Sequence, residues 1–386
     1  MRITPESFWF TGNVNPKPDT RMEVRRSKNQ TSARPGIPSL KAAIMKNTGV
    51  NTCSIRQLNK GLLLDAIKGE EGVNISDLTM KTRLSVSTCS NILRGLIETG
   101  EVIVSEDKVA RGGRPARVYR YNPSHFCIVC ILIKGDAETL TLSYSVVDAA
   151  GQAIEKGSKA IKDMNVSHLD KLLTVLKQKH PLTTAAIAVP GVIEGGTVWE
   201  SEVEGLVGVE IVQYLEAGHN LRVIADNDIN FSAIAYGRSQ DDAAAASLAF
   251  FVFPSNQCPG CSLIINNALV KGKSNYAGEI ASIMPLLAAS TPNDKRLDES
   301  VEALAGTFAA VIITIINPNV IVIAGDRVRP DMLRAIEETC LTIIPNRHMP
   351  EIIVKPDFES ECFKGMKAMA LNGGSSKNKL FKTCAM

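Results

Sequence analysis

A polar pair follows an apolar run in the segment VIADNDINFSAIAYGR, residues 223–238. The apolar residues at its start predict a strand, and the spacing of the apolar residues after Asp228 predicts a helix. A carboxylate at such a strand-to-helix corner can act as a general base, accept hydrogen bonds from a sugar, or cap the helix. The residue types leave these three roles of Asp228 open, with Asn227 beside it as a companion for a ligand.

A second set of polar residues lies on one side of a helix predicted over residues 86–99. Apolar residues recur from Cys89 to Ile97 at the i, i+3, i+4, i+7, i+8 spacing of a buried stripe. The opposite side carries hydroxyls, an amide and an arginine, which suit base edges and phosphates in a DNA major groove. The candidate DNA-binding residues in and next to this helix are Ser85, Ser87, Thr88, Ser90, Asn91 and Arg94.

Three helices and then two short strands are predicted across residues 55–122. We expect Ser76 to cap the second helix, Ser85 to cap the third, and Gly100 to end the third. The tight turn between the second and third helices completes a helix-turn-helix. The two strands frame a loop, which makes the unit a winged helix-turn-helix.

The predicted wing is the loop SEDKVARGGRPA between the two strands. Its glycines let the backbone approach a duplex, and Arg111 and Arg114 can lie along a minor groove or across phosphates. A three-helix module that binds another protein through a solvated polar face is the alternative. The wing that directly follows the helix-turn-helix favours double-stranded DNA as the partner.

Charge is divided unevenly along the 386-residue chain. Residues 1–122 hold 20 lysines and arginines against 11 acidic residues, a net of +9, and the remainder holds 23 against 29, a net of −6. A basic front and an acidic back indicate a DNA-facing end and a separate body. Residues 1–50 are rich in polar and basic residues without a sustained period, so we expect a disordered basic tail there.

Neither a run of 18 apolar residues nor the apolar core of a signal peptide occurs, so we expect a cytoplasmic protein with no membrane partner. Nine cysteines are an odd number, and several lie in apolar runs such as FCIVCILI. In a reducing compartment such residues pack as small hydrophobic side chains. Cys127 and Cys130 are three positions apart on a predicted strand, so they should face opposite ways and not share a metal ion.

Strands and helices alternate from Phe126 onward, in two successive sets. This alternation predicts an α/β fold of two lobes with a cleft between them. The expected organisation is a winged helix-turn-helix DNA-binding domain at residues 51–122, a ligand-sensing domain at 123–372 and a disordered tail at 373–386.

Several segments resemble the ROK family (repressors, open reading frames and sugar kinases), in particular its winged-helix transcriptional regulators. The head segment is IRQLNKGLLLDAIKGEEGVNISDLTMKTRLSVSTCSNILRGLIETGEV, and the body segments are VPGVIEGGTVWES, VIADNDINFSAIAYG, KGKSNYAGEIASIMP and VEALAGTFAAVIITIINPNVIVIAGD. The resemblance covers roughly residues 55–371. It implies an actin-like, hexokinase-like body whose cleft binds a sugar, and a homodimer or homotetramer on a near-palindromic operator.

The resemblance also implies roles for single residues. Asn227 and Asp228 match the family's Asn-Asp pair, in which the Asp is the base of kinase members. Glu279, in the triplet Ala-Gly-Glu, matches a glutamate that contacts the sugar. These three residues are the candidate ligand-binding set.

The body departs from the kinase pattern where phosphates would bind. The stretch ILIKGDAETLTL lacks the Asp-x-Gly-Gly-Thr turn, and FPSNQCPGCSLI replaces the Gly-Thr-Gly turn. Pro254 and Pro259 remove backbone donors from the latter, so we expect no use of ATP and no catalytic residue, with Asp228 at a vestigial base position. Ala281 and Ser282 stand where the family's zinc-binding histidine belongs, so neither a metal nor another cofactor is expected.

The sequence therefore predicts a DNA-binding transcriptional regulator of carbohydrate genes, a repressor, controlled by a sugar or sugar phosphate bound in a non-catalytic body. Two alternatives stay open. One is a sugar kinase with an appended DNA-binding head. The other is a DNA-binding regulator whose body binds no ligand and only oligomerises.

Overall fold

The computed structural model describes residues 52–106, 117–135, 140–240, 246–255, 257–290 and 300–371. The two predicted tails and the wing arginines Arg111 and Arg114 lie outside the described residues. No helix in the described ranges is both long and apolar enough to cross a bilayer.

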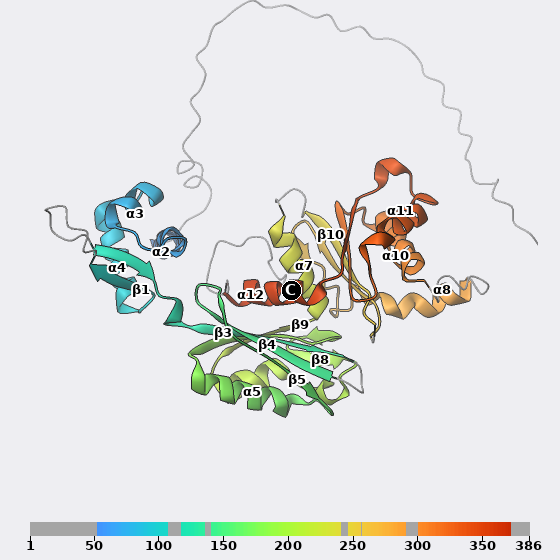
Figure 1. Ribbon diagram of the computed structural model, residues 1–386, viewed down its shortest axis with the longest axis horizontal. Helices are drawn as coiled ribbons and strands as arrows, with labels where there is room; N and C mark the ends of the chain where they lie inside the picture. The colour runs from blue at the N-terminus through green and yellow to red at the C-terminus, as the bar shows by residue number, and fades with distance from the viewer. Residues whose placement is uncertain are drawn as a thin grey trace, which may run out of the picture. The chain divides into compact units, whose positions relative to one another are not determined.

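Three helices and a two-stranded antiparallel ribbon form the head (Figure 1). Val102 pairs with Tyr121 at one end of the ribbon and Glu106 pairs with Arg117 at the other. Leu63, Leu78, Leu93 and residues from both strands share one buried cluster, so the ribbon packs on the helices as a wing. The elements are α2 (Thr52–Lys68), α3 (Ile75–Thr82), α4 (Val86–Glu98), β1 (Val102–Glu106) and β2 (Arg117–Tyr121).

The sequence predicted the N-cap of the third helix correctly and the N-cap of the second helix wrongly. Ser85 caps α4 as expected, because its side chain accepts a hydrogen bond from the Thr88 backbone N–H. Ser76 is wrong as the cap of α3. Asn74 takes that place, with an extended backbone and a side chain that accepts from the Asp77 N–H at 3.0 Å, so the helix begins before Ser76.

The first lobe of the body is built on a five-stranded sheet of order β5-β4-β3-β6-β9. β3, β4 and β5 pair antiparallel, and β6 and β9 continue the sheet parallel to β3. The strands are β3 (Cys127–Lys134), β4 (Leu140–Asp148), β5 (Ala153–Ile161), β6 (Leu182–Ala188) and β9 (Arg222–Asp226). The lobe also contains α5 (Val166–Lys179), the hairpin β7 (Val192–Glu194) and β8 (Thr197–Glu200), α6 (Ile211–His219) and α7 (Asp228–Ser239).

The second lobe repeats this plan in a sheet of order β12-β11-β10-β13-β14, with three antiparallel strands followed by two parallel ones. The repetition confirms the predicted two-lobed, actin-like α/β class, with a winged helix-turn-helix before it. The strands are β10 (Ser247–Val252), β11 (Gly260–Ile265), β12 (Ala268–Leu269), β13 (Val320–Ala324) and β14 (Glu351–Lys355). The helices are the short η3 (Ile280–Ile283), then α8 (Met284–Ser290), α10 (Val301–Ile315), α11 (Leu333–Leu341) and α12 (Phe358–Leu371).

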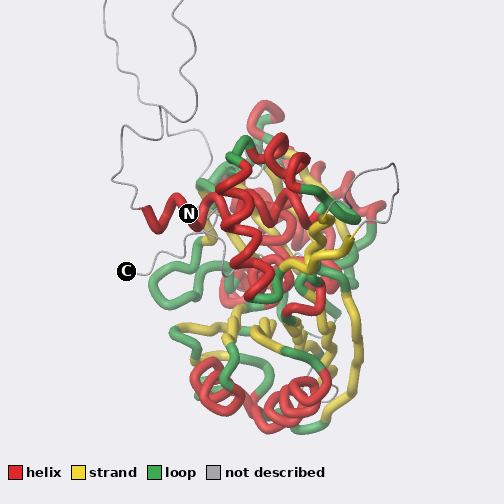
Figure 2. Tube along the Cα trace, turned by 90° about the vertical axis from the view of Figure 1, so that its left-hand side faces the viewer, coloured by secondary structure: helices red, strands yellow, loops and turns green. Residues whose placement is uncertain are grey.

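Helices cover both faces of each sheet, which explains why the central strands are apolar throughout (Figure 2). In β3, Cys127 and Ile131 pack with α5 and α6, whereas Ile128 and Cys130 face the opposite way, toward α12. The prediction that Cys127 and Cys130 point to opposite faces is therefore confirmed. In β10, Phe251 belongs to a cluster with residues of α10 and α11, while alternate residues of the strand face α7.

One helix pair joins the two lobes. α12 lies on β3 and β6 of the first lobe and also against α7, which in turn packs on β10 and β11 of the second lobe (Figure 1). α12 approaches α7 so closely that a Cβ atom at Gly365 would overlap the backbone carbonyl oxygen of Phe231. Only glycine fits at this crossing.

Gly365→Ala is therefore expected to lower the free energy of unfolding by about 1–3 kcal/mol, because the backbones must separate to admit the methyl group. Urea denaturation of the full chain measures the loss. Gly218→Ala in α6 is the matched control, since its Cβ would meet only an ordinary contact with Asp170. The control should leave stability unchanged or raise it by up to about 1 kcal/mol. Equal effects of the two substitutions would contradict the close crossing.

Candidate functional site: an exposed helix face and an acidic cavity

The face of α4 opposite its buried stripe is open to solvent. Ser87, Asn91 and Arg94 are exposed, while Cys89 and Leu93 are buried against the other head helices. The hydrophobic stripe was predicted to include Ile97, which is wrong, because this side chain is 40% exposed at the end of the helix. An amide and a guanidinium one turn apart on an exposed helix face can donate to base edges and phosphates.

Hydroxyl groups gather at the first turn of α4. The Ser85 hydroxyl lies 2.9 Å from that of Ser87 and 2.8 Å from that of Thr88, besides accepting from the Thr88 N–H. The Ser85 hydroxyl therefore serves as the N-cap of α4. Thr88 and Ser90 are partly buried at the edge of the face. Beyond this first turn, the exposed polar side chains of α4 are those of Asn91, Arg94 and Glu98.

A cavity of about 370 Å³ lies in the body, where strands of both lobes end. Residues just after the carboxyl ends of β6, β9 and β10 line it, including Gly191, Asn227 and Pro254. Loops at the carboxyl ends of parallel strands are the usual ligand sites of such sheets, and the volume suits a small molecule. The cavity brings together the three residues predicted to bind a ligand, Asn227, Asp228 and Glu279.

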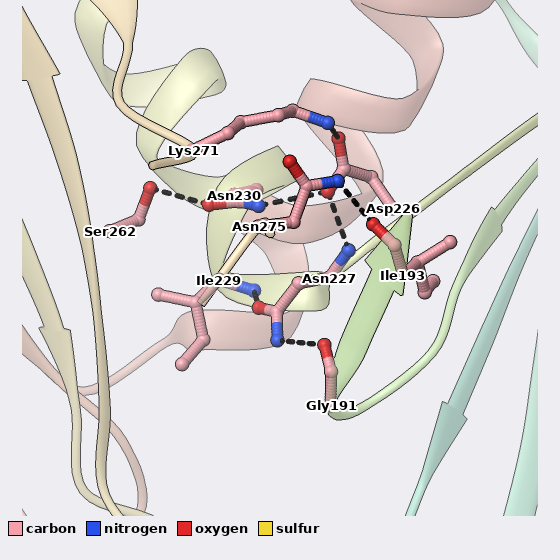
Figure 3. Close-up of polar contacts among 9 residues, drawn as sticks. All are labelled: Gly191, Ile193, Asp226, Asn227, Ile229, Asn230, Ser262, Lys271 and Asn275. Carbon is pink, nitrogen blue, oxygen red and sulfur yellow. Dashed lines mark hydrogen bonds and ion pairs between the residues drawn. The ribbon is translucent and has the colours of Figure 1, made fainter. Parts of the chain in front are cut away.

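Asn227 anchors the cavity wall to the start of α7 (Figure 3). Its side-chain oxygen accepts from the Ile229 N–H at 2.8 Å, which makes Asn227 the cap of the helix. Its side-chain nitrogen donates to the Gly191 carbonyl at 2.9 Å. Both ends of the amide are thus used within the protein, and the capping role that the sequence left open for Asp228 belongs to Asn227.

Asp228 is the first residue of α7 and is only 5% exposed. The pKa of its carboxyl group is raised from 3.8 to about 7, chiefly by burial, which outweighs the backbone hydrogen bonds that lower it; the charges of Glu279 and Glu202 contribute smaller increases. Its Oδ1 accepts from the Ile229 N–H at 2.9 Å. A buried carboxyl group that can change protonation near neutral pH is suited to proton exchange or to binding a donor.

Glu279 lies in the same wall, just before η3, and is partly buried. Its pKa is raised by burial first and then by the negative charges of Glu200 and Glu202. Both of these glutamates also line the cavity. Sequence reasoning did not single them out, because Glu200 ends, and Glu202 follows, a hairpin (β7–β8) that was not predicted. No local pattern of residues marks either glutamate.

A polar network links the lobes beside the cavity (Figure 3). The Asp226 carboxylate accepts from Lys271 Nζ at 2.7 Å and from Asn230 Nδ2 at 2.8 Å. Asn230 in turn accepts from the Ser262 hydroxyl at 2.8 Å, and Asn275 donates to the Ile193 carbonyl. Sequence analysis missed these positions, although Asp226 lies two residues before Asp228 and Lys271 belongs to the segment KGKSNYAGE.

Three further observations concern the surroundings of the cavity. Trp199 is 57% exposed and does not belong to the cavity wall. Among the described residues, no group of three or more His, Cys, Asp or Glu is arranged to hold a metal ion. Glu202 accepts from the Cys258 N–H at 3.2 Å, which joins the loop after β8 to the loop after β10.

This fold defines the class of protein, which has a two-lobed, sugar-kinase-like body preceded by a winged helix-turn-helix. Comparison with known families assigns the body more closely. Residues 129–293 match the model of the ROK family, so the chain carries a ROK family domain.

Individual proteins agree with this assignment. The xylose repressor of Lactiplantibacillus pentosus is 22% identical over 284 residues, which cover 69% of this chain and 69% of that protein. Across the curated relatives that it matches, the chain spans between 59% and 69% of their length.

Solved structures show the same fold. A ROK family transcriptional regulator, a homologue of the Escherichia coli MLC protein, superposes with a TM-score of 0.54 at 14% identity, over 82% of this chain and 99% of that one. A ROK family glucokinase from Streptomyces griseus, in complex with glucose and AMPPNP, has a TM-score of 0.50 at 14% identity, over 64% of this chain and 100% of that one. At such identities the likeness is one of fold alone.

Asp228→Asn is expected to change how stability depends on pH. Because the pKa of Asp228 is raised to about 7, the folded chain keeps this proton at pH values where the unfolded chain has released it. The stabilisation is full below about pH 4 and is lost as the pH rises through about 7, by about 1.4 kcal/mol per pH unit. The asparagine variant lacks this loss, so its unfolding free energy relative to the wild type should grow as the pH rises from about 5 to about 8.

Urea denaturation at several pH values measures this difference. Glu204→Gln is the control, since Glu204 is exposed and lies outside the cavity wall. Its difference from the wild type should not vary with pH. A pH-independent difference for Asp228→Asn as well would contradict a carboxyl group that is protonated in the folded protein.

Proposed function

We propose that this protein is a sequence-specific DNA-binding transcriptional repressor whose ROK body senses a carbohydrate and does not phosphorylate it. The observation that carries the proposal is the combination, in one chain, of a helix face open to solvent in the head and a cavity lined by a buried acidic residue in the body. Relatives named xylose repressor support the class of target genes. The cytoplasm is the proposed location, because that is where operator DNA is found.

The exposed face of α4 supports the DNA-binding part of the proposal. Ser87, Asn91 and Arg94 project away from the buried stripe, as groove-reading side chains must. The proposed DNA contacts are Ser85, Ser87, Thr88, Ser90, Asn91 and Arg94 from α4 and its cap, together with Arg111 and Arg114 from the predicted wing. A homodimer or homotetramer would present paired heads to half-sites about one helical turn apart.

The cavity supports the sensing part. Asn227, Asp228 and Glu279 are the proposed ligand-binding residues. Asp226 and Lys271 link the lobes beside them, so a ligand that changes the lobe separation must also strain or relax this ion pair. Such a ligand can alter DNA affinity only if it binds one arrangement of the lobes more tightly than the other.

A second cavity, of about 520 Å³, argues against phosphoryl transfer from ATP. It is lined by residues after β3, β10, β13 and β14, on the side where the sequence lacks both phosphate turns. Its one lysine, Lys134, pairs with Glu359, and Asp326 and Asp357 add two further carboxylates. A triphosphate would meet net negative charge there and two prolines, Pro254 and Pro356, without N–H groups to donate.

Arg94→Ala is expected to weaken binding to the preferred DNA site by about tenfold or more, since a bidentate base contact contributes about 1–3 kcal/mol. The site is first selected from random double-stranded oligonucleotides with the wild-type chain, and affinity is then compared by gel shift at one fixed salt concentration. Arg334→Ala, at an exposed position on α11, is the control and should bind as the wild type does. Equal affinity for Arg94→Ala and wild type would remove this face of α4 from the DNA interface.

A thermal-shift screen of the full chain against free sugars separates the sensor from its alternatives. A ligand that binds the folded state raises the melting temperature, by an amount that grows with its concentration over Kd. We expect at least one sugar to do so, and to do so less with Asp228→Asn. Consumption of ATP with the same sugar would establish the kinase alternative. No shift with any sugar would favour a body that only oligomerises.

A further inference from the structure

The charge of the cavity wall bears on what kind of ligand the cavity accepts. Within the described part of the chain, every charged side chain that lines it is acidic, and no lysine, arginine or histidine does. Lys271, in the adjoining network, is already paired with Asp226. The four acidic residues are Glu200, Glu202, Asp228 and Glu279.

Two of these acidic residues, Asp228 and Glu279, have pKa values that are raised by other carboxylates of the wall as well as by burial. The pKa of Asp228 is raised by burial and then by Glu279 and Glu202, and that of Glu279 by burial and then by Glu200 and Glu202. The neighbouring Cys258 thiol behaves in the same way, with its pKa raised by burial and then by Glu202. Acidic side chains in the cavity wall are therefore not balanced by a basic one among the described residues that line it.

Among the described residues, only backbone N–H groups donate hydrogen bonds to the buried acid Asp228. Asp228 is 5% exposed, and no side chain among the described residues donates a hydrogen bond to it. Its Oδ1 accepts only from the backbone of α7, and the carboxylate lines the cavity. A ligand that brings both a hydrogen-bond donor and a positive charge should therefore form the most stable contact with this buried acidic group.

We propose that the effector is a sugar that carries a protonated amine, of the 2-amino sugar class, and that a phosphorylated sugar is excluded. The inference rests on the proposed sensing function. An ammonium group supplies three donors and offsets the repulsion among the carboxylates. A phosphate brings close to two further negative charges and no positive counterpart in the wall. A neutral sugar can donate hydroxyls but leaves the repulsion in place.

A matched set of ligands tests this inference by isothermal titration calorimetry on the full chain near neutral pH. Glucose, galactose and mannose are each compared as the free sugar, the 2-amino sugar, the N-acetyl derivative and the 6-phosphate. For at least one of the three sugars, the amino form should bind about tenfold or more tightly than the free and N-acetyl forms. The 6-phosphate should give no measurable heat of binding.

The outcomes separate this inference from the proposed function. A free sugar, an N-acetyl form or a 6-phosphate that binds as tightly as the amino form would overturn the inference and leave carbohydrate sensing intact. Absence of binding by all the compounds would overturn both.

A variant that removes one charge from the cavity wall gives a second test. It measures a ratio of two ligand affinities, which a change in folding alone would not alter. Glu202→Gln removes one negative charge but keeps an oxygen that can accept from the Cys258 N–H. It should lower the ratio of amino-sugar affinity to free-sugar affinity by about fivefold to tenfold. Glu204→Gln, at an exposed position outside the wall, should keep the wild-type ratio. If Glu202→Gln weakened both ligands equally, the preference for a positive charge would be refuted.

Discussion

The crossing of α12 over α7 is the contact on which the body depends. At Gly365 the two helix backbones meet with no room for a side chain, and on either side of this point α12 lies on the first sheet while α7 lies on the second. The position of α7 is thereby fixed relative to both sheets. Since Asn227 and Asp228 form the start of α7, the same crossing fixes the deepest part of the cavity.

Polar contacts connect the lobes in addition to the apolar packing of α7 and α12. The side chains of Lys271 and Asp226 are 29% and 12% exposed, so water can compete with their ion pair. Asn230 and Ser262 add a second polar link between α7 and β11. Interactions of this kind contribute little net stability but depend strongly on geometry. They suit a joint that must have two arrangements of similar free energy.

The sequence was most informative where one physical rule decides the outcome. A stripe of apolar residues fixed the orientation of α4, and the Ser85 cap fixed its start. The strand at Val320–Ala324 follows from five consecutive apolar residues, all of which are buried. The roles of Asn227, Asp228 and Glu279 stay predictions, although the fold brings them into one cavity.

Prediction failed where the outcome depends on contacts between distant segments. Ser76 and Asn74 are both good capping residues, so residue type does not decide between them, and it is the extended backbone at Asn74 in the folded head that makes it the cap. Ile97 fits the helical period, but the helix ends before anything covers it. Glu202 has no local pattern that marks it. Its importance arises from Asp228 and Glu279, which lie near it only in the folded chain.

The uneven distribution of charge along the chain bears on the role of the acidic cavity. Residues 1–122 carry a net charge of +9, of which +3 belongs to residues 51–122, and the remainder of the chain carries −6. In the proposed regulator, the phosphate backbone of DNA attracts this basic front of the chain and is repelled by the body. If the effector is the amino sugar proposed above, the acidic cavity favours a ligand of opposite charge to DNA. The effector and DNA then bind to protein groups of opposite charge, so the two binding events do not compete for the same groups.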